Sequence, residues 1–134
     1  MQPKRQKYRK QFRGHSKGSA TRGSTLAFGE YGIKSLGRGW LTAKQIEAAR
    51  RSVANSTKRG GKLWIRVFPD KPTTSKAAGV RMGGGKGDVK EYVTVVTPGR
   101  IIFELGGTTE EVAREAFKAA AARLPFDTKV VTRV

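Results

Sequence analysis

The strongest periodic pattern in the chain lies in residues 42–59 and predicts a helix with one buried face. Thr42 and Gln45 form a capping box, which favours a helix start at Thr42, and Gly60 with Gly61 predicts its end. Apolar residues recur at spacings of three and four positions, as on one side of a helix: Ile46, Ala49 and Val53.

A second helical pattern begins at Thr108 and ends before Pro125. Thr108 and Glu111 again form a capping box, and the acidic residues of the first turn suit the helix dipole. The apolar stripe of this segment consists of Val112, Ala113, Ala116, Phe117, Ala120 and Leu124. The pattern therefore predicts a second helix with one apolar side.

Alternating apolar and polar residues predict strands elsewhere. The predicted strands span residues 25–33, 62–68, 92–97, 101–105 and 128–134. In the first of them, Leu26, Phe28 and Ile33 are expected to face the core. Pro98 and Gly99 predict a tight hairpin turn between two of the strands. Because strands and helices do not alternate one for one, we expect an α+β fold with a mixed or antiparallel sheet.

The predicted strand at 62–68 has two chemically different faces. One face carries aliphatic side chains: Leu63, Ile65 and Val67. The other face carries aromatic and basic side chains: Trp64, Arg66 and Phe68. This alternation is typical of a strand that separates two environments.

Composition adds a strong prediction about partners. The 134 residues suffice for about one domain, and 28 Lys and Arg against 10 Asp and Glu give a net charge of +18. Residues 1–66 hold 17 of the basic residues and only two acids, Glu30 and Glu47. Such an excess repels itself, so a polyanionic partner is expected. We expect a basic arm at residues 1–23 and a single domain at residues 24–134.

The arm at residues 1–23 contains no acid and interleaves its charges with two rings, Tyr8 and Phe12. Basic side chains bind phosphates and rings stack on unpaired bases, so this composition favours RNA. The alternative is a disordered tail that only aids solubility. The basic residues of the arm are Lys4, Arg5, Lys7, Arg9, Lys10, Arg13, Lys17 and Arg22.

The predicted helix at 42–59 also has a basic side. Its cations are Lys44, Arg50, Arg51, Lys58 and Arg59. Only Glu47 offers them a carboxylate, so pairing within the helix does not explain the excess. A merely solvated face is the plain alternative. We expect these cations, together with Arg38 in the preceding turn, to bind RNA.

Residues 69–91 form the longest stretch without a core pattern, and a glycine-rich basic run occupies the middle of this stretch. The run departs from the Walker pattern at Val80 and Gly87, so it does not predict a nucleotide-binding loop. Two interpretations remain open. One is a hairpin tip without function, and the other is a basic finger whose Arg81 and Lys86 bind phosphate or stack on RNA.

Several classes of function are disfavoured by the composition. The sequence has no Cys, and His15 lies in the basic arm without a nearby carboxylate, so we expect no metal centre and no catalytic nucleophile of that kind. No apolar run approaches the roughly 18–20 residues of a membrane span. We expect neither an enzyme nor a cofactor. A cytoplasmic location is expected, with a transit peptide at the N-terminus as the minor alternative.

Several blocks of the sequence resemble a known family. The longest reads Trp-Ile-Arg-Val-Phe-Pro-Asp-Lys-Pro at residues 64–72. Further blocks lie at residues 2–5, 28–29, 41–43, 45–51, 81–83, 85–87, 111–116 and 129–133. In this order they resemble the family of the bacterial large-ribosomal-subunit protein numbered sixteen, over essentially the whole chain.

The resemblance implies an α/β-hammerhead-like α+β fold and a structural role in the large ribosomal subunit. The implied partners are large-subunit rRNA, A-site and P-site tRNA near the peptidyl-transferase centre, and neighbouring ribosomal proteins, but no membrane and no second copy of the chain. Such a protein supports subunit assembly and translation on cytoplasmic ribosomes, and the sequence does not separate a bacterial from a plastid-encoded source. The alternative is a free-standing RNA chaperone or RNA-modification factor.

The resemblance also carries site residues over by position. It assigns the basic arm at residues 3–13 and three arginines of the first helix, Arg50, Arg51 and Arg59, to rRNA. It directs the glycine-rich loop toward tRNA, through Arg81, Met82, Gly83, Gly85 and Lys86. Gly84 stands where many members of the family carry Lys, which removes one positive charge from this loop.

Overall fold

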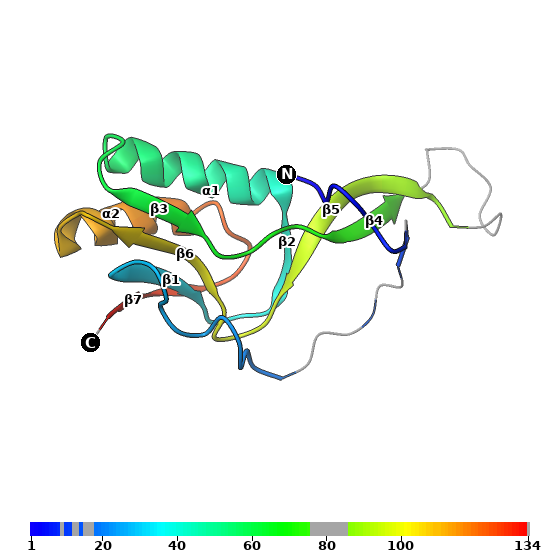
Figure 1. Cartoon of the computed structure of the whole chain (residues 1–134), viewed down its shortest axis with the longest axis horizontal. Helices are drawn as coiled ribbons and strands as arrows, with labels where there is room; N and C mark the ends of the chain where they lie inside the picture. Colours follow the sequence, from blue (N-terminus) through cyan, green and yellow to red (C-terminus); the bar gives the residue numbers. More distant parts are fainter. Residues whose placement is uncertain (9, 12–13, 15–17, 76–85, 134) are drawn as a thin grey trace.

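Two antiparallel sheets and two helices make up the part of the chain that the computed structural model describes, residues 1–8, 10–11, 14, 18–75 and 86–133 (Figure 1). The larger sheet has the strand order β3-β6-β1-β7, and the smaller has the order β2-β5-β4. In chain order the elements are β1 Tyr31–Ser35, β2 Gly39–Thr42, α1 Ala43–Ser56, β3 Lys62–Ile65, β4 Lys71–Ser75, β5 Asp88–Val96, β6 Ile101–Gly106, α2 Glu110–Ala121 and β7 Thr128–Thr132. The α+β prediction is confirmed, with two sheets where one was expected.

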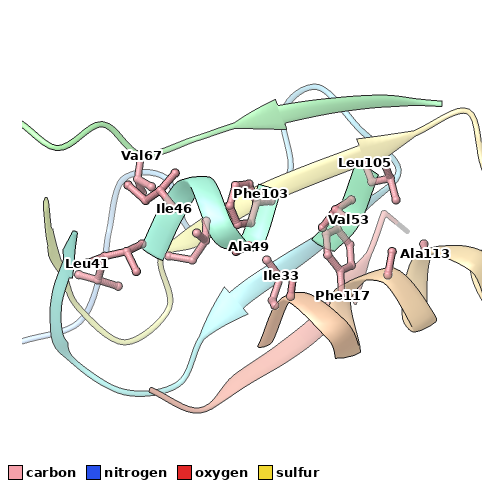
Figure 2. Close-up of a cluster of buried hydrophobic side chains, with 14 residues drawn as sticks. Ile33, Leu41, Ile46, Ala49, Val53, Val67, Phe103, Leu105, Ala113 and Phe117 are labelled. Carbon is pink, nitrogen blue, oxygen red and sulfur yellow. The ribbon is translucent and has the colours of Figure 1, made fainter. Parts of the chain in front are cut away.

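The main core lies between the two helices and one face of the larger sheet. Phe103 of β6 and Phe117 of α2 are both wholly buried in it, beside Val53 of α1 (Figure 2). Burial of one such side chain contributes about 1.5–3 kcal/mol relative to exposure. Residues of β6 alternate between the two faces of the sheet, so Phe103 faces the helices and Glu104 faces the opposite side.

Helix α1 begins as the sequence predicts. The Thr42 hydroxyl accepts from the Gln45 amide at 3.2 Å, and the Gln45 side chain accepts from the Thr42 amide at 2.9 Å. The predicted stripe is wholly buried: Ile46, Ala49 and Val53.

The end of α1 differs from the prediction, because the helix stops at Ser56, before the two glycines. Lys58 and Arg59 take left-handed backbone conformations, with φ of 52° and 62°. The Arg59 amide donates to the Ala54 carbonyl at 2.9 Å and reverses the chain there. Gly61 serves close packing instead, since a Cβ at this position would lie 2.5 Å from the Gly106 carbonyl oxygen.

Helix α2 begins one residue later than its predicted capping box. The cap is Thr109, whose hydroxyl accepts from the Val112 amide at 3.4 Å. The Thr108 hydroxyl is buried and has no hydrogen-bond partner among the described residues. The prediction of Thr108 as the cap was therefore wrong. The predicted stripe packs in the core mainly through Ala113, Ala116, Phe117 and Ala120.

The predicted strand at 25–33 is displaced, and the observed strand β1 starts only at Tyr31. Ile33 is buried as expected, whereas Leu26 is half-buried and Phe28 is exposed. The segment before β1 folds over the sheet face opposite the helices, because its amides donate to a side chain of β6 instead of to a neighbouring strand. The Glu104 carboxylate, described below, is that acceptor.

Pro98 and Gly99 form a turn, but they do not join a hairpin. The Arg100 amide donates to the Thr97 carbonyl at 3.2 Å, and Gly99 has a φ of 97°, as the sequence predicts for a turn. Strand β5 then pairs with β2 and β4, whereas β6 pairs with β1 and β3. The turn therefore carries the chain from one sheet to the other, and the hairpin prediction was wrong.

The stretch at 69–91 contains two strand segments that the sequence did not predict. Strand β4 and the start of β5 pair as a hairpin, from Lys71 opposite Val93 to Ser75 opposite Asp88. This hairpin extends away from the two helices (Figure 1). Strand β2 was also missed, and β3 ends at Ile65, earlier than the predicted Phe68.

Candidate nucleic-acid interface

The exposed side of α1 gathers the predicted cations of that helix. Lys44, Arg51, Lys58 and Arg59 are exposed, and Arg50 is half-buried. The Glu47 carboxylate contacts both neighbouring arginines, at 2.5 Å for Arg50 and 3.3 Å for Arg51.

Pairing within α1 therefore involves this one carboxylate and two arginines, and it does not account for the excess of positive charge on this face. The hydrogen bond from Arg50 is the main cause that lowers the pKa of Glu47 to about 2, and Arg51 adds to the effect. The same contact raises the pKa of the Arg50 guanidinium. One carboxylate, ionised at physiological pH, is thus shared by two guanidiniums. Helix α1 keeps a net positive charge, because this is its one acid against three cations.

The two cations after α1 are held in an uncommon geometry. Lys58 and Arg59 have the positive φ angles that side chains other than glycine rarely adopt. Both side chains are exposed. They extend the positive side of α1 into the loop before β3.

Helix α2 provides a contrast, because its charges balance. Glu110 and Arg114 form an exposed ion pair at 2.9 Å. From the start of α2 to Arg123, the chain carries three acids and three bases. The positive face of the described structure is therefore on the side of α1 and not of α2.

Residues 1–8 and 10–11 of the basic arm lie along the β4–β5 hairpin (Figure 1). The Gln6 side chain donates to the Tyr92 hydroxyl. The Lys86 ammonium donates to the Gln11 carbonyl, and the Lys10 ammonium donates to the Lys86 carbonyl at 3.3 Å. The structure thereby brings the arm and the base of the glycine-rich loop together.

The remaining described cations of the arm face solvent. Lys4, Arg5 and Lys7 are exposed, and the Lys7 ammonium lies 5.6 Å from the centre of the Tyr8 ring. Tyr8 itself is 63% exposed, which leaves its ring available for stacking. Met1 and Gln2 line a shallow depression together with Lys44 and Lys90, so the arm also approaches the start of α1.

The end of the arm is fixed to the chain between β5 and β6. The Ala20 amide donates to the Pro98 carbonyl at 2.8 Å, and the Ile101 amide donates to the Gly23 carbonyl at 2.7 Å. Arg22 is exposed beside these bonds. Arg38 is exposed in the turn before β2, at a different place on the surface.

Several predicted site residues lie outside the described part of the chain. In the arm these are Arg9, Phe12, Arg13 and Lys17, and in the loop they are Arg81, Met82, Gly83 and Gly85. His15 is also outside it. Only Lys86 represents the predicted tRNA-facing loop among the described residues.

Sequence reasoning missed a row of rings and cations on the larger sheet. Phe28 stacks on Trp64 with 6.0 Å between ring centres and 19° between planes. The Lys62 ammonium lies 5.3 Å from the Trp64 ring, and the Arg66 guanidinium lies 5.1 Å from the Phe28 ring. The strand alternation predicted that Trp64 and Arg66 share a face. Nothing in the sequence indicated that Phe28 lies beside them, because Phe28 was expected to face the core.

Other kinds of site find little support within the described residues. No group of three or more His, Asp or Glu side chains in that part of the chain is placed to hold a metal ion. None of its helices has the length and apolarity needed to cross a membrane. Two depressions on its surface, one lined by Arg66 and Arg100 and one lined by Trp40 and Lys71, are open to solvent and have both polar and apolar linings.

Comparison with known families gives one match across nearly the whole chain. The family described as ribosomal protein L16p/L10e matches residues 3–131. The match includes the arm, α1, the β4–β5 hairpin and both sheets, and it confirms the resemblance found in the sequence. A structural family of this kind agrees with the basic surface and with the expected ribosomal and RNA partners. The chain belongs to the ribosomal protein L16p/L10e family and is a protein of the large ribosomal subunit.

Proposed function

We propose that this protein is a structural constituent of the large subunit that binds large-subunit rRNA through α1 and the basic arm. The observation that carries the proposal is the difference between the two helices. Helix α1 and the following loop present five cations for one acid, whereas α2 is balanced. Solubility alone gives no reason for such a difference, while a phosphate backbone on one side of the molecule does.

The ion pairs on α1 do not oppose this role. Arg51 is 72% exposed in its side chain, and exposed pairs of this kind add little to stability because water screens them. The two arginines can therefore replace Glu47 by a phosphate oxygen at a small cost in free energy. A guanidinium can also bind phosphate with two donors. Glu47 holds Arg50 and Arg51 in place until RNA binds.

The glycine-rich loop has a different role in this proposal. It contacts A-site and P-site tRNA near the peptidyl-transferase centre, and it supports translation after assembly. Its base at Lys86 lies on the hairpin that extends away from the helices (Figure 1). A projection of this kind suits contact with a ligand beyond the rRNA-bound surface.

A matched pair of variants tests the rRNA surface. Arg51→Ala and Arg114→Ala each remove one exposed arginine and one i,i+4 ion pair, on α1 and α2 respectively. We expect Arg51→Ala to weaken binding to purified large-subunit rRNA several-fold at moderate salt, and Arg114→Ala to leave it within error. Filter binding measures both, and equal effects of the two variants would contradict the placement of the surface.

The loop is tested in assembled particles. We expect Arg81→Ala to enter large subunits normally but to slow peptide synthesis, with Arg81→Lys intermediate because lysine lacks the planar fork. The measurements are the amount of variant in purified subunits and the translation rate of those subunits. If incorporation collapses while the assembled particles translate normally, Arg81 serves assembly and the tRNA role is wrong.

A further inference from the structure

The larger sheet carries a row of alternating cations and rings on the face opposite the helices. Its members in spatial order are Lys62, Trp64, Phe28 and Arg66. Phe28 is 58% exposed, whereas the core residues on the other face of the sheet are fully covered. An exposed aromatic ring flanked by cations needs an explanation beyond packing.

A buried carboxylate fixes the backbone that carries this ring. Glu104 is wholly buried, and its Oε1 accepts from the amides of three successive residues: Ala27 at 2.9 Å, Phe28 at 2.8 Å and Gly29 at 2.9 Å. Without this carboxylate the three amides would need another acceptor, from a strand or from water. The three hydrogen bonds fix the backbone at Phe28 and so hold its exposed ring in one place.

The same carboxylate also fixes the neighbouring cation. Glu104 Oε2 accepts from the Arg66 guanidinium, which in turn lies against the Phe28 ring. The guanidinium has five N–H donors, and the Glu104 contact uses one of them. One buried acid therefore positions both an exposed ring and a cation beside it.

Two glycines make room for the row. A Cβ on Gly29 would lie 2.8 Å from the Leu105 carbonyl oxygen, so only glycine allows this close approach to β6. A Cβ on Gly106 would lie 3.2 Å from the Trp64 ring. The backbone, the buried acid and the glycines all serve the same exposed arrangement.

We propose that this row is a binding site for one unpaired rRNA nucleotide, whose base contacts the Phe28 and Trp64 rings and whose phosphate contacts Lys62 and Arg66. The proposal rests on the proposed rRNA-binding function and adds a site on a face away from α1. Charge complementarity favours RNA, because Lys62 and Arg66 together outnumber the carboxylate that the structure shows beside the row, Glu104. Stacking on aromatic side chains is the usual way in which proteins hold splayed bases.

The test uses the full chain and protein-free large-subunit rRNA. We expect Phe28→Ala to weaken binding between about 5-fold and about 100-fold, which is the range for loss of one stacked base. Phe28→Leu is expected to lose as much, and Phe28→Tyr to keep parental affinity. Leu36→Ala, which removes another exposed apolar side chain, is the matched control and is expected to bind normally. Thermal melting establishes that each variant is folded.

A second readout reports on the ring itself. In a Trp40→Phe variant Trp64 is the remaining tryptophan. When Phe28 is left unchanged in this variant, we expect rRNA to quench the fluorescence of Trp64. The nucleotide site would be overturned if Phe28→Leu bound rRNA as tightly as the parent does. It would also be overturned if saturating rRNA did not quench Trp64 fluorescence. So would normal rRNA affinity of Phe28→Ala combined with loss of a neighbouring protein from variant subunits, which would assign the row to a protein partner. Failure of the proposed function is distinct, because the parent itself would then not bind rRNA.

Discussion

At the scale of single residues, Glu104 has the least ordinary environment among the described side chains. Burial would raise the pKa of its carboxyl, but the Gly29 amide, the Arg66 guanidinium and the amides of Phe28 and Ala27 lower it below the usual value. The strand pattern at residues 101–105 contains this glutamate but gives no sign of its burial or of its partners. Its donors could not be identified from the sequence, because they lie 38 to 77 residues away along the chain.

Replacement of this carboxylate gives a prediction for stability. Glu104→Gln leaves the Arg66 guanidinium, whose side chain is only 20% exposed, without its carboxylate, so we expect the free energy of unfolding at neutral pH to fall by about 3 kcal/mol. Urea denaturation measures the change. Glu110→Gln, which breaks an exposed pair, is the control and should change it by less than about 1 kcal/mol.

The same pair of proteins gives a prediction for pH. The folded-state pKa of Glu104 is lowered from 4.5, so its contribution is present above that pH and is lost as the pH falls through the folded pKa. The difference between the parent and Glu104→Gln should therefore shrink on acidification below pH 4.5. A difference at pH 3 as large as at pH 7 would show that Glu104 is not held as a carboxylate.

At the scale of elements, the helix patterns located both helices, whereas strand bounds and strand pairing were harder to predict. Helix α1 was predictable because its cap and its buried stripe lie within one segment. Strands β2 and β4 were missed because they are short and contain Gly, Pro and Thr in place of an apolar alternation. The turn at Pro98 was found, but the partners of the strands on either side lie far away in the sequence.

The start of α2 allows a direct test at this scale. Thr109→Ala removes the observed cap and should lower the free energy of unfolding by about 1 kcal/mol. Thr108→Val removes a buried hydroxyl that has no partner among the described residues, so it should leave stability unchanged or raise it. Chemical denaturation of both variants decides the point. The reverse order would mean that Thr108 caps the helix, as the sequence alone predicted.

At the scale of the whole molecule, charge is arranged independently of the core. The net charge of +18 was readable from the composition, and the basic arm and α1 face were readable from the local sequence. The approach of the arm to the β4–β5 hairpin was not, because it depends on single side-chain contacts such as that of Gln6 with Tyr92. The nucleotide site on the larger sheet was hidden for the same reason.

This charge arrangement predicts a steep response to salt. If about 6–10 phosphates are neutralised, affinity for large-subunit rRNA should fall by about 10³–10⁵ between 50 and 200 mM salt. The double variant Arg50→Ala with Arg51→Ala should lower both the affinity and the slope of log K against log salt. A slope near zero in the parent would mean that shape and apolar contacts dominate, and it would contradict an electrostatic role for α1.

The contacts of the first 29 residues have a consequence for synthesis. The bonds of Gln6, Gln11, Arg22 and Phe28 all reach forward to side chains or backbone 75 to 86 positions later. At roughly 5–20 residues per second, the arm waits on the order of ten seconds before its partners are made. During this delay the basic arm lacks the residues that position it, so its final conformation is set only after the hairpin and the chain between β5 and β6 have been synthesised.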